Sequence, residues 1–134
     1  MSSPEKPLPR LWFGPPPELE AGEEWVAHYA ANRTQGKRAV GGGLHFTNQR
    51  VLFCPNAVDR SLGGQPWECA VAEVSSVSAE PGRFSLAEIF SGGLRTRLRI
   101  DLRNGATQLF VVARVAEAQE KLNAVLAAPN GLLF

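Results

Sequence analysis

The stretch from Leu94 to Val112, LRTRLRIDLRNGATQLFVV, decides the fold. Apolar and charged side chains alternate along residues 94–103, with the period of two that is typical of a half-buried strand. Asn104-Gly105 is the favoured pair for a two-residue type I′ turn. The stretch therefore predicts a β-hairpin in which Arg103 pairs with Ala106.

This register gives the hairpin two faces. Leu98 lies opposite Val111 and Ile100 opposite Leu109 on the core side. On the other side Phe110 and Val112 lie opposite arginines, where they would be partly bare unless something covers them. We therefore expect an interaction face composed of Arg95, Arg97, Arg99, Phe110 and Val112, with Arg103 continuing the arginine stripe.

The chain before this hairpin predicts five further short strands. They cover residues 25–34, 37–48, 50–54, 67–71 and 74–79, with a loop over residues 55–66. The triplet Gly41–Gly43 inside the second of these strands indicates a bulge or a sharp bend. Residues 83–93 fit either a short strand or a loop with one helical turn.

The end of the chain predicts one helix over residues 114–128. Its apolar side chains recur at three- and four-residue spacing (Val115, Ala118, Leu122, Val125 and Leu126), and Pro129 ends it. Because helix follows strand only once, alternating parallel units are excluded. The fold class is mainly β: a seven-stranded antiparallel barrel or sandwich capped by a C-terminal α-helix.

The N-terminal residues 1–17 form a separate arm with six prolines. Proline fixes φ and removes a donor, so the arm is expected to be extended and the folded domain to span residues 18–134. Trp12 and Phe13 interrupt this polar arm. We expect them to dock on the outer face that holds Phe110 and Val112, in the same chain or in a second copy.

Length and composition limit the class of protein. A chain of 134 residues with 44% hydrophobic residues and a formal net charge of +1 is typical of one globular domain and lacks the basic field that gathers nucleic acid. The sequence has neither a secretory leader nor an apolar run long enough for a transmembrane segment. With Cys54 and Cys69 as buried thiols, these features favour a cytoplasmic protein, and the richness in Ala, Arg, Gly and Pro favours a bacterial one.

Residues Gly43–Phe53, GLHFTNQRVLF, are close to a family pattern of glycine, alternating apolar residues and Thr-Asn-x-Arg. With Trp67-Glu68, the run from Val74 to Val77 and the final hairpin, they resemble a GRAM domain of the pleckstrin-homology-like superfold over about residues 18–128. The resemblance implies a barrel with a C-terminal helix that binds lipids or proteins and does not catalyse a reaction. It carries over no ligand residues.

The sequence contains no constellation for catalysis, and no cofactor is expected. His28, His45 and the two cysteines lie singly on different strands without paired ligand spacing, so no metal is expected. Glu23 and Glu24 are neighbours that point to opposite faces of a strand, and we expect both at a solvated strand entrance. The glycine pairs lack the spacing of a phosphate-binding loop.

A basic turn between the first two strands carries Arg33, Lys37 and Arg38. By the resemblance it is a candidate site for an anionic phospholipid headgroup, although charged turns are common on any surface. Protein interaction or self-association through the arginine–phenylalanine face and the arm is the function expected first. Binding of an anionic lipid or membrane surface through the basic turn is the alternative.

Overall fold

The structure is a computed structural model, and it describes residues 18–80 and 96–128. Within these two ranges the chain forms seven strands and a C-terminal helix, as predicted, and most boundaries agree within one residue. The elements are β1 (Trp25–Gln35), β2 (Arg38–Thr47), β3 (Arg50–Pro55), α2 (Ala57–Ser61), β4 (Trp67–Ala70), the 3₁₀ turn η1 (Val71–Glu73), β5 (Val74–Glu80), β6 (Arg97–Leu102), β7 (Thr107–Val112) and α4 (Val115–Ala127).

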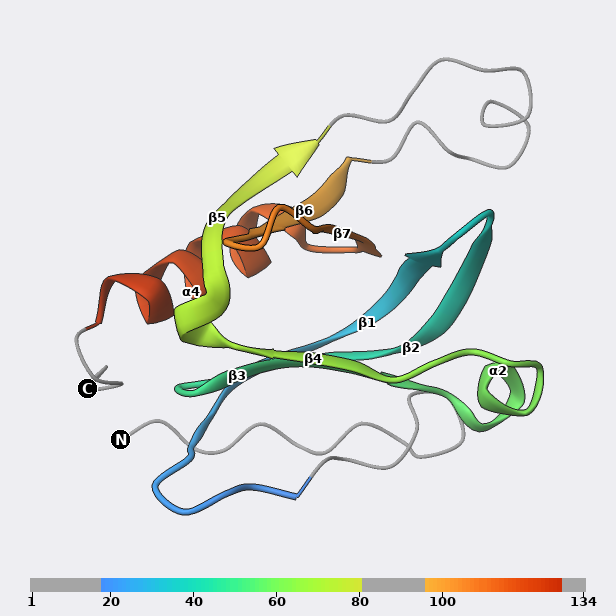
Figure 1. Ribbon diagram of the computed structural model, residues 1–134, viewed down its shortest axis with the longest axis horizontal. Helices are drawn as coiled ribbons and strands as arrows, with labels where there is room; N and C mark the ends of the chain where they lie inside the picture. The colour runs from blue at the N-terminus through green and yellow to red at the C-terminus, as the bar shows by residue number, and fades with distance from the viewer. Residues whose placement is uncertain (1–17, 81–95, 129–134) are drawn as a thin grey trace.

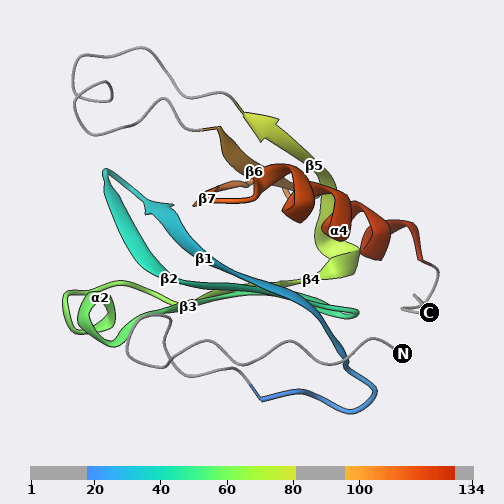
Figure 2. The ribbon, with the colours of Figure 1, turned by 180° about the vertical axis from the view of Figure 1, so that it is seen from behind.

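The strands form one antiparallel sheet in the order β4-β3-β2-β1-β7-β6-β5. The sheet folds back on itself, with β1 to β4 in one layer and β5 to β7 in the other (Figure 1). From behind, α4 lies alongside the β5–β7 layer (Figure 2). The mainly β fold class capped by a C-terminal helix is confirmed.

The core lies between the two layers. Its fully buried side chains come from both layers and from α4: Leu44, Phe46, Phe53, Leu98, Ile100, Phe110 and Leu122. Ala118 and Val125 of α4 are also buried, and Val115 and Leu126 pack at the margin of the core. The apolar stripe predicted from the sequence is thus the face that α4 turns to the sheet.

The β6–β7 hairpin has a longer turn than the sequence predicts. Leu102 pairs with Ala106, donating its N–H to the Ala106 carbonyl at 2.9 Å, and the Gly105 N–H reaches the Leu102 carbonyl at 3.0 Å. Gly105 has a φ of 92°, in the left-handed region that favours glycine. The turn therefore contains three residues, 103–105, which is the other common hairpin length.

One extra turn residue reverses the faces of β7. Arg97 pairs with Val111 and Arg99 with Leu109, and Phe110 and Val112 are buried, with exposed fractions of 0% and 6%. The prediction that Phe110 and Val112 lie on the outer face is wrong. The longer turn brings Phe110 against the rings of Phe53 and Trp67, at centroid distances of 5.8 and 5.7 Å, so the aromatic ring is removed from water.

The glycine triplet occupies a regular part of the β1–β2 ladder. Gly41–Gly43 pair in sequence with residues 30–32, and the register shift of this ladder lies at Trp25 and Ala27 instead. Gly42 is needed for close approach, because a Cβ there would lie 2.2 Å from the Cys54 carbonyl oxygen. The predicted bulge is therefore absent from the triplet, although β2 curves strongly (Figure 1).

Cys54 and Cys69 are free and buried, as expected. Burial raises the pKa of Cys69 to about 12 and also raises that of Cys54. No helix in the described ranges is long and apolar enough to cross a bilayer. Trp12, Phe13, Arg95 and residues 83–93 lie outside the described residues, so the expectations that concern them stay predictions.

Candidate functional site

The basic turn between β1 and β2 does not present its three cations as one cluster. Arg33 pairs with the buried Val40 and is itself half-buried. Lys37 is exposed in the turn, and Arg38 begins β2. The three side chains therefore have different environments, and only Lys37 is the solvated turn residue that the sequence suggests.

Arg33 lies over the indole of Trp67. Its guanidinium carbon is 5.9 Å from the ring centroid, and its Nε donates to Oε1 of Gln108 at 3.0 Å. Burial lowers the pKa of Arg33, but arginine stays charged at any physiological pH. Among the described residues, no acceptor or carboxylate contacts its two terminal nitrogens. This guanidinium edge can therefore take an anion through two parallel hydrogen bonds.

Arg38 instead fastens α2 to the sheet. Its Nη2 contacts Asp59 Oδ1 at 3.1 Å, and its guanidinium also donates to the carbonyls of Asp59 and Leu62. Oδ2 of Asp59 accepts the Gly41 N–H at 3.0 Å. Burial acts to raise the pKa of Asp59, but the hydrogen bonds from Gly41 and Arg38 together hold this pKa below its usual range. The charge of Arg38 is thus neutralised by Asp59 in the same chain.

The short helix α2 places exposed apolar side chains beside the basic turn. Val58 and Leu62 are 61% and 65% exposed, and Arg60 between them is exposed as well. Gln35 and Gln65 tie the following loop to β1, because the Gln65 N–H donates to Gln35 Oε1 at 2.9 Å. We call the exposed set Lys37, Val58, Arg60 and Leu62 the basic–apolar rim.

Sequence reasoning missed α2, although the sequence carries its signal. Asn56 is the N-cap: its Oδ1 accepts the Asp59 N–H at 2.8 Å. An asparagine followed three residues later by an acid is typical of a helix start, but five residues are too few to show an amphipathic period. The rim was therefore hidden inside a predicted loop.

Within the arginine stripe on β6, Arg99 has acidic partners in the same chain. Arg99 contacts Asp101 at 3.1 Å and Glu80 at 3.0 Å, and the hydrogen bonds that it donates to Asp101 raise the pKa of Arg99. Arg103 donates to the Ala72 carbonyl at 2.9 Å. Leu109 and Val111, which take the places predicted for Phe110 and Val112, are half-buried. The face is therefore more polar than the sequence predicts, because Arg99 is paired with acids and Phe110 and Val112 are buried.

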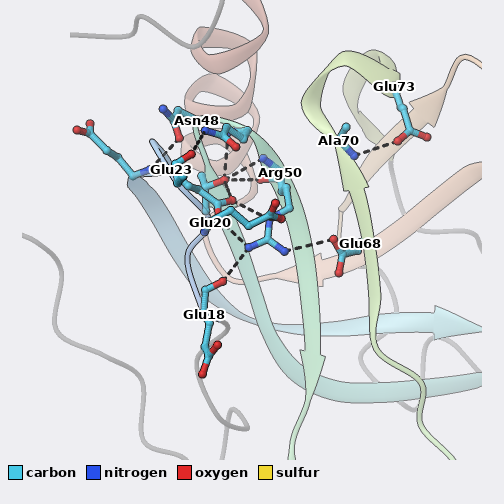
Figure 3. Close-up of polar contacts among 12 residues, drawn as sticks. Glu18, Glu20, Glu23, Asn48, Arg50, Glu68, Ala70 and Glu73 are labelled. Carbon is cyan, nitrogen blue, oxygen red and sulfur yellow. Dashed lines mark hydrogen bonds and ion pairs between the residues drawn. The ribbon is translucent and has the colours of Figure 1, made fainter.

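A second polar cluster joins the segment 18–24 to the start of β3 (Figure 3). Arg50 binds both carboxylate oxygens of Glu23, through Nε at 2.8 Å and Nη2 at 2.7 Å, and Glu23 is buried. Its guanidinium also contacts Glu20, Glu68 and the Glu18 carbonyl, at 3.2, 3.3 and 2.9 Å. The prediction that Glu23 is solvated is wrong, because the sequence did not reveal its partner 27 residues away.

The Thr-Asn-x-Arg motif explains this cluster. Thr47 Oγ1 donates to Glu23 and accepts the Arg50 N–H at 2.8 Å, which closes the β2–β3 turn. Asn48 accepts the Glu24 N–H at 2.8 Å and donates to the Gly22 carbonyl at 3.1 Å. The motif residues thus serve as a clasp that holds the entry to β1, which is a structural role.

The two histidines are neighbours across β1 and β2, with ring centroids 6.1 Å apart. Sequence reasoning had placed them singly. Within residues 18–80 and 96–128, no group of three histidine, cysteine, aspartate or glutamate side chains could hold a metal ion.

No family model matches the sequence, and no curated protein matches it. Solved structures do resemble the fold. A C-terminal domain of an unknown protein from Leishmania infantum is 13% identical, with a TM-score of 0.61 over 81% of this chain and 88% of that one. The Vps36 N-terminal PH domain is 15% identical, with a TM-score of 0.56 over 84% of this chain and 88% of that one. These similarities show that the fold is pleckstrin-homology-like.

Proposed function

We propose that this chain is a non-catalytic, GRAM-like binding module that docks on an anionic membrane surface through the basic–apolar rim. The observation that carries the proposal is the exposure of Val58 and Leu62 beside Lys37 and Arg60. Aliphatic side chains flanked by cations suit the boundary between lipid headgroups and acyl chains.

Local charge supports this proposal although the whole chain is nearly neutral. Arg33, Lys37, Arg38 and Arg60 lie at this end of the fold together with Asp59. Each basic residue near an anionic leaflet contributes about 1 kcal/mol, and burial of apolar surface contributes about 25 cal/mol per Å². The affinity expected from Lys37 and Arg60 with two aliphatic side chains is therefore modest.

Arg33 would add a specific contact. Its terminal nitrogens form the open end of a guanidinium that Trp67 and Gln108 hold in place. A phosphate group offers the paired oxygens that such an edge binds best. In this proposal the rim supplies adhesion, and Arg33 recognises the phosphate of a headgroup.

Binding of a protein partner or self-association is the competing function. The sequence favoured it because of an outer face with Phe110 and Val112, and both side chains are buried. Without that face, the most exposed large apolar side chains among the described residues are Val58 and Leu62 of the rim. A protein ligand for the rim is the function that would remain if acidic vesicles do not bind.

The experiment is co-sedimentation with vesicles of phosphatidylcholine alone and with added phosphatidylserine, over a range of salt. We expect binding only to the acidic vesicles, weakened by salt. Lys37→Ala/Arg60→Ala should weaken it about 30-fold, because two contributions of about 1 kcal/mol are lost. Arg114→Ala/Lys121→Ala, at the N-cap of α4 and within α4, removes the same charge elsewhere and should change binding little.

Further variants separate the parts of the site. Val58→Ser/Leu62→Ser should weaken binding without changing its dependence on salt. Arg33→Lys should reduce preference among acidic headgroups, because lysine lacks the paired donors. Absence of wild-type binding to acidic vesicles at low salt would refute the membrane proposal and leave a protein ligand for the rim.

A further inference from the structure

A second surface, independent of the rim, lies on the outer side of β1 to β4. Side chains alternate along β3, so Val51 and Phe53 enter the core, whereas Leu52 and Cys54 point to the opposite face. Leu52 is nevertheless only 4% exposed and Cys54 9%. Two side chains on the outer face of the sheet are thus buried without belonging to the core cluster.

His45 extends this buried outer patch onto β2. It pairs with Leu52 across the ladder, is 4% exposed and packs against the Trp25 ring at 5.5 Å. Neither of its ring nitrogens has a hydrogen-bond partner in the described part of the chain. This imidazole is therefore shielded from water although no polar group of the described chain replaces that water.

The patch is also hollowed. Gly43 lies opposite Cys54, so no side chain fills the sheet surface there. Beside it is a pocket of about 240 Å³, lined by the apolar residues Leu52, Phe53, Cys54, Pro66 and Trp67 and by the charged residues Glu18, Arg50 and Glu68. The hollow is mainly apolar and lies where the described chain begins, since the Glu18 carbonyl accepts a hydrogen bond from Arg50.

We propose that Trp12 and Phe13 of the same chain dock on this patch, over Leu52 and Cys54. The sequence predicted docking on the β6–β7 face, but that face is polar and its phenylalanine is buried. The outer patch is apolar, hollow and next to Glu18, so it suits the arm better. A second copy of the chain is the competing occupant.

The reach of the arm fits this placement. Glu18 is held at Arg50, and Cys54 lies four residues further along β3, about 13 Å at 3.3 Å per residue. Phe13 precedes Glu18 by five residues, about 16 Å at the 3.1 Å per residue of a polyproline helix. Residues 15–17 are all proline, so the spacer is stiff and docking orders few additional dihedral angles.

The rate of thiol modification at Cys54 should show whether the arm covers the patch, and the rate at Cys69 is the control. Cys54 lies on the outer patch and Cys69 in the core. In the full chain, Trp12→Ser/Phe13→Ser should increase the rate at which a thiol reagent modifies Cys54 by at least about tenfold, with Cys69 unchanged. Peptide mapping after labelling distinguishes the two sites. An unchanged rate at Cys54 would overturn the proposal.

A disulfide experiment distinguishes the same chain from a second copy and does not depend on the stability of the double variant. In a Cys69→Ser background, Trp12→Cys should form a disulfide with Cys54 within a monomer under mild oxidation. Ser2→Cys, at the far end of the arm, should not. A disulfide found only in dimers, or equal disulfide formation from both positions, would overturn docking in the same chain.

Discussion

Arg50 and Glu23 face each other through two parallel hydrogen bonds, of 2.8 and 2.7 Å, although 27 residues separate them in the sequence. Glu23 is buried, and Thr47 donates a further hydrogen bond to it. The hydrogen bond from Arg50 is the main cause that lowers the pKa of Glu23 to about 2. This pair fixes the segment that enters β1, so it should dominate the response of the fold to acid.

Glu23 should make the protein sensitive to acid below about pH 4.5. Its pKa is lowered in the folded state, so its contribution is complete above the unfolded value of 4.5 and is lost as the pH falls towards 2. That shift corresponds to about 3 kcal/mol of unfolding free energy. Glu23→Gln should lower stability at pH 7 by a similar amount and flatten the pH dependence between 4.5 and 2, measured by urea unfolding. An equally steep curve in Glu23→Gln would contradict this role.

His45 should add acid sensitivity in a higher pH range. Burial, together with the charge of His28, lowers the pKa of His45 from 6.5 to about 4. Between these two pH values His45 is protonated in the unfolded chain and neutral in the folded chain. The unfolding free energy therefore falls as the pH drops from 6.5 towards 4. His45→Phe keeps an aromatic ring without the unpartnered nitrogens, so it should be more stable than wild type at pH 5. If the difference in melting temperature between pH 7.5 and 5 is the same in both proteins, His45 does not cause it.

The strands, the helix and their order were predictable because they depend on local periodicity. The apolar spacing of residues 115–126 and the alternation of residues 97–102 are read from neighbouring residues, and both elements have the predicted faces. The β6–β7 register depends on whether the turn holds two or three residues. Asn104-Gly105 fits both lengths, and burial of Phe110 against Phe53 favours the longer one.

The candidate sites were less predictable because they depend on contacts between distant residues. Arg33 and Arg38 look alike in sequence, yet one packs on Trp67 and the other binds Asp59. Glu23 looks like any other acid near the start of the domain, and only the folded β2–β3 turn brings Arg50 to it. The sequence located the turn between the first two strands, but which partner each of its arginines contacts depends on tertiary structure.

A side chain at Gly42 should destabilise the fold strongly, whereas a side chain at the neighbouring Gly41 should destabilise it less. A Cβ on Gly42 would lie 2.2 Å from the Cys54 carbonyl oxygen and 2.8 Å from the Pro55 Cα, which are both backbone atoms. A Cβ on Gly41 would meet side-chain atoms of Asp59, Asn56 and Asn32 at 3.0 to 3.2 Å, and these can shift. Gly42→Ala should therefore cost about 3 kcal/mol by forcing β2 and β3 apart. Gly41→Ala should cost clearly less, and similar losses in thermal unfolding would show that the close approach is not rigid.

Arg38 and Arg60 should separate stability from binding, because each substitution removes one positive charge from the same end of the fold. Arg38 holds α2 through Asp59 and two backbone carbonyls, whereas Arg60 is exposed on the rim. Arg38→Ala leaves the partly buried Asp59 without its ion pair and should lower the unfolding free energy by about 1 kcal/mol or more. It should also loosen α2, seen as faster amide exchange at residues 57–61.

Arg60→Ala should leave the unfolding free energy and the amide exchange of α2 unchanged. It should weaken binding to phosphatidylserine vesicles by about fivefold, which corresponds to the loss of about 1 kcal/mol. If Arg60→Ala destabilises the fold as much as Arg38→Ala, or leaves vesicle binding intact, then the rim does not act as an electrostatic contact.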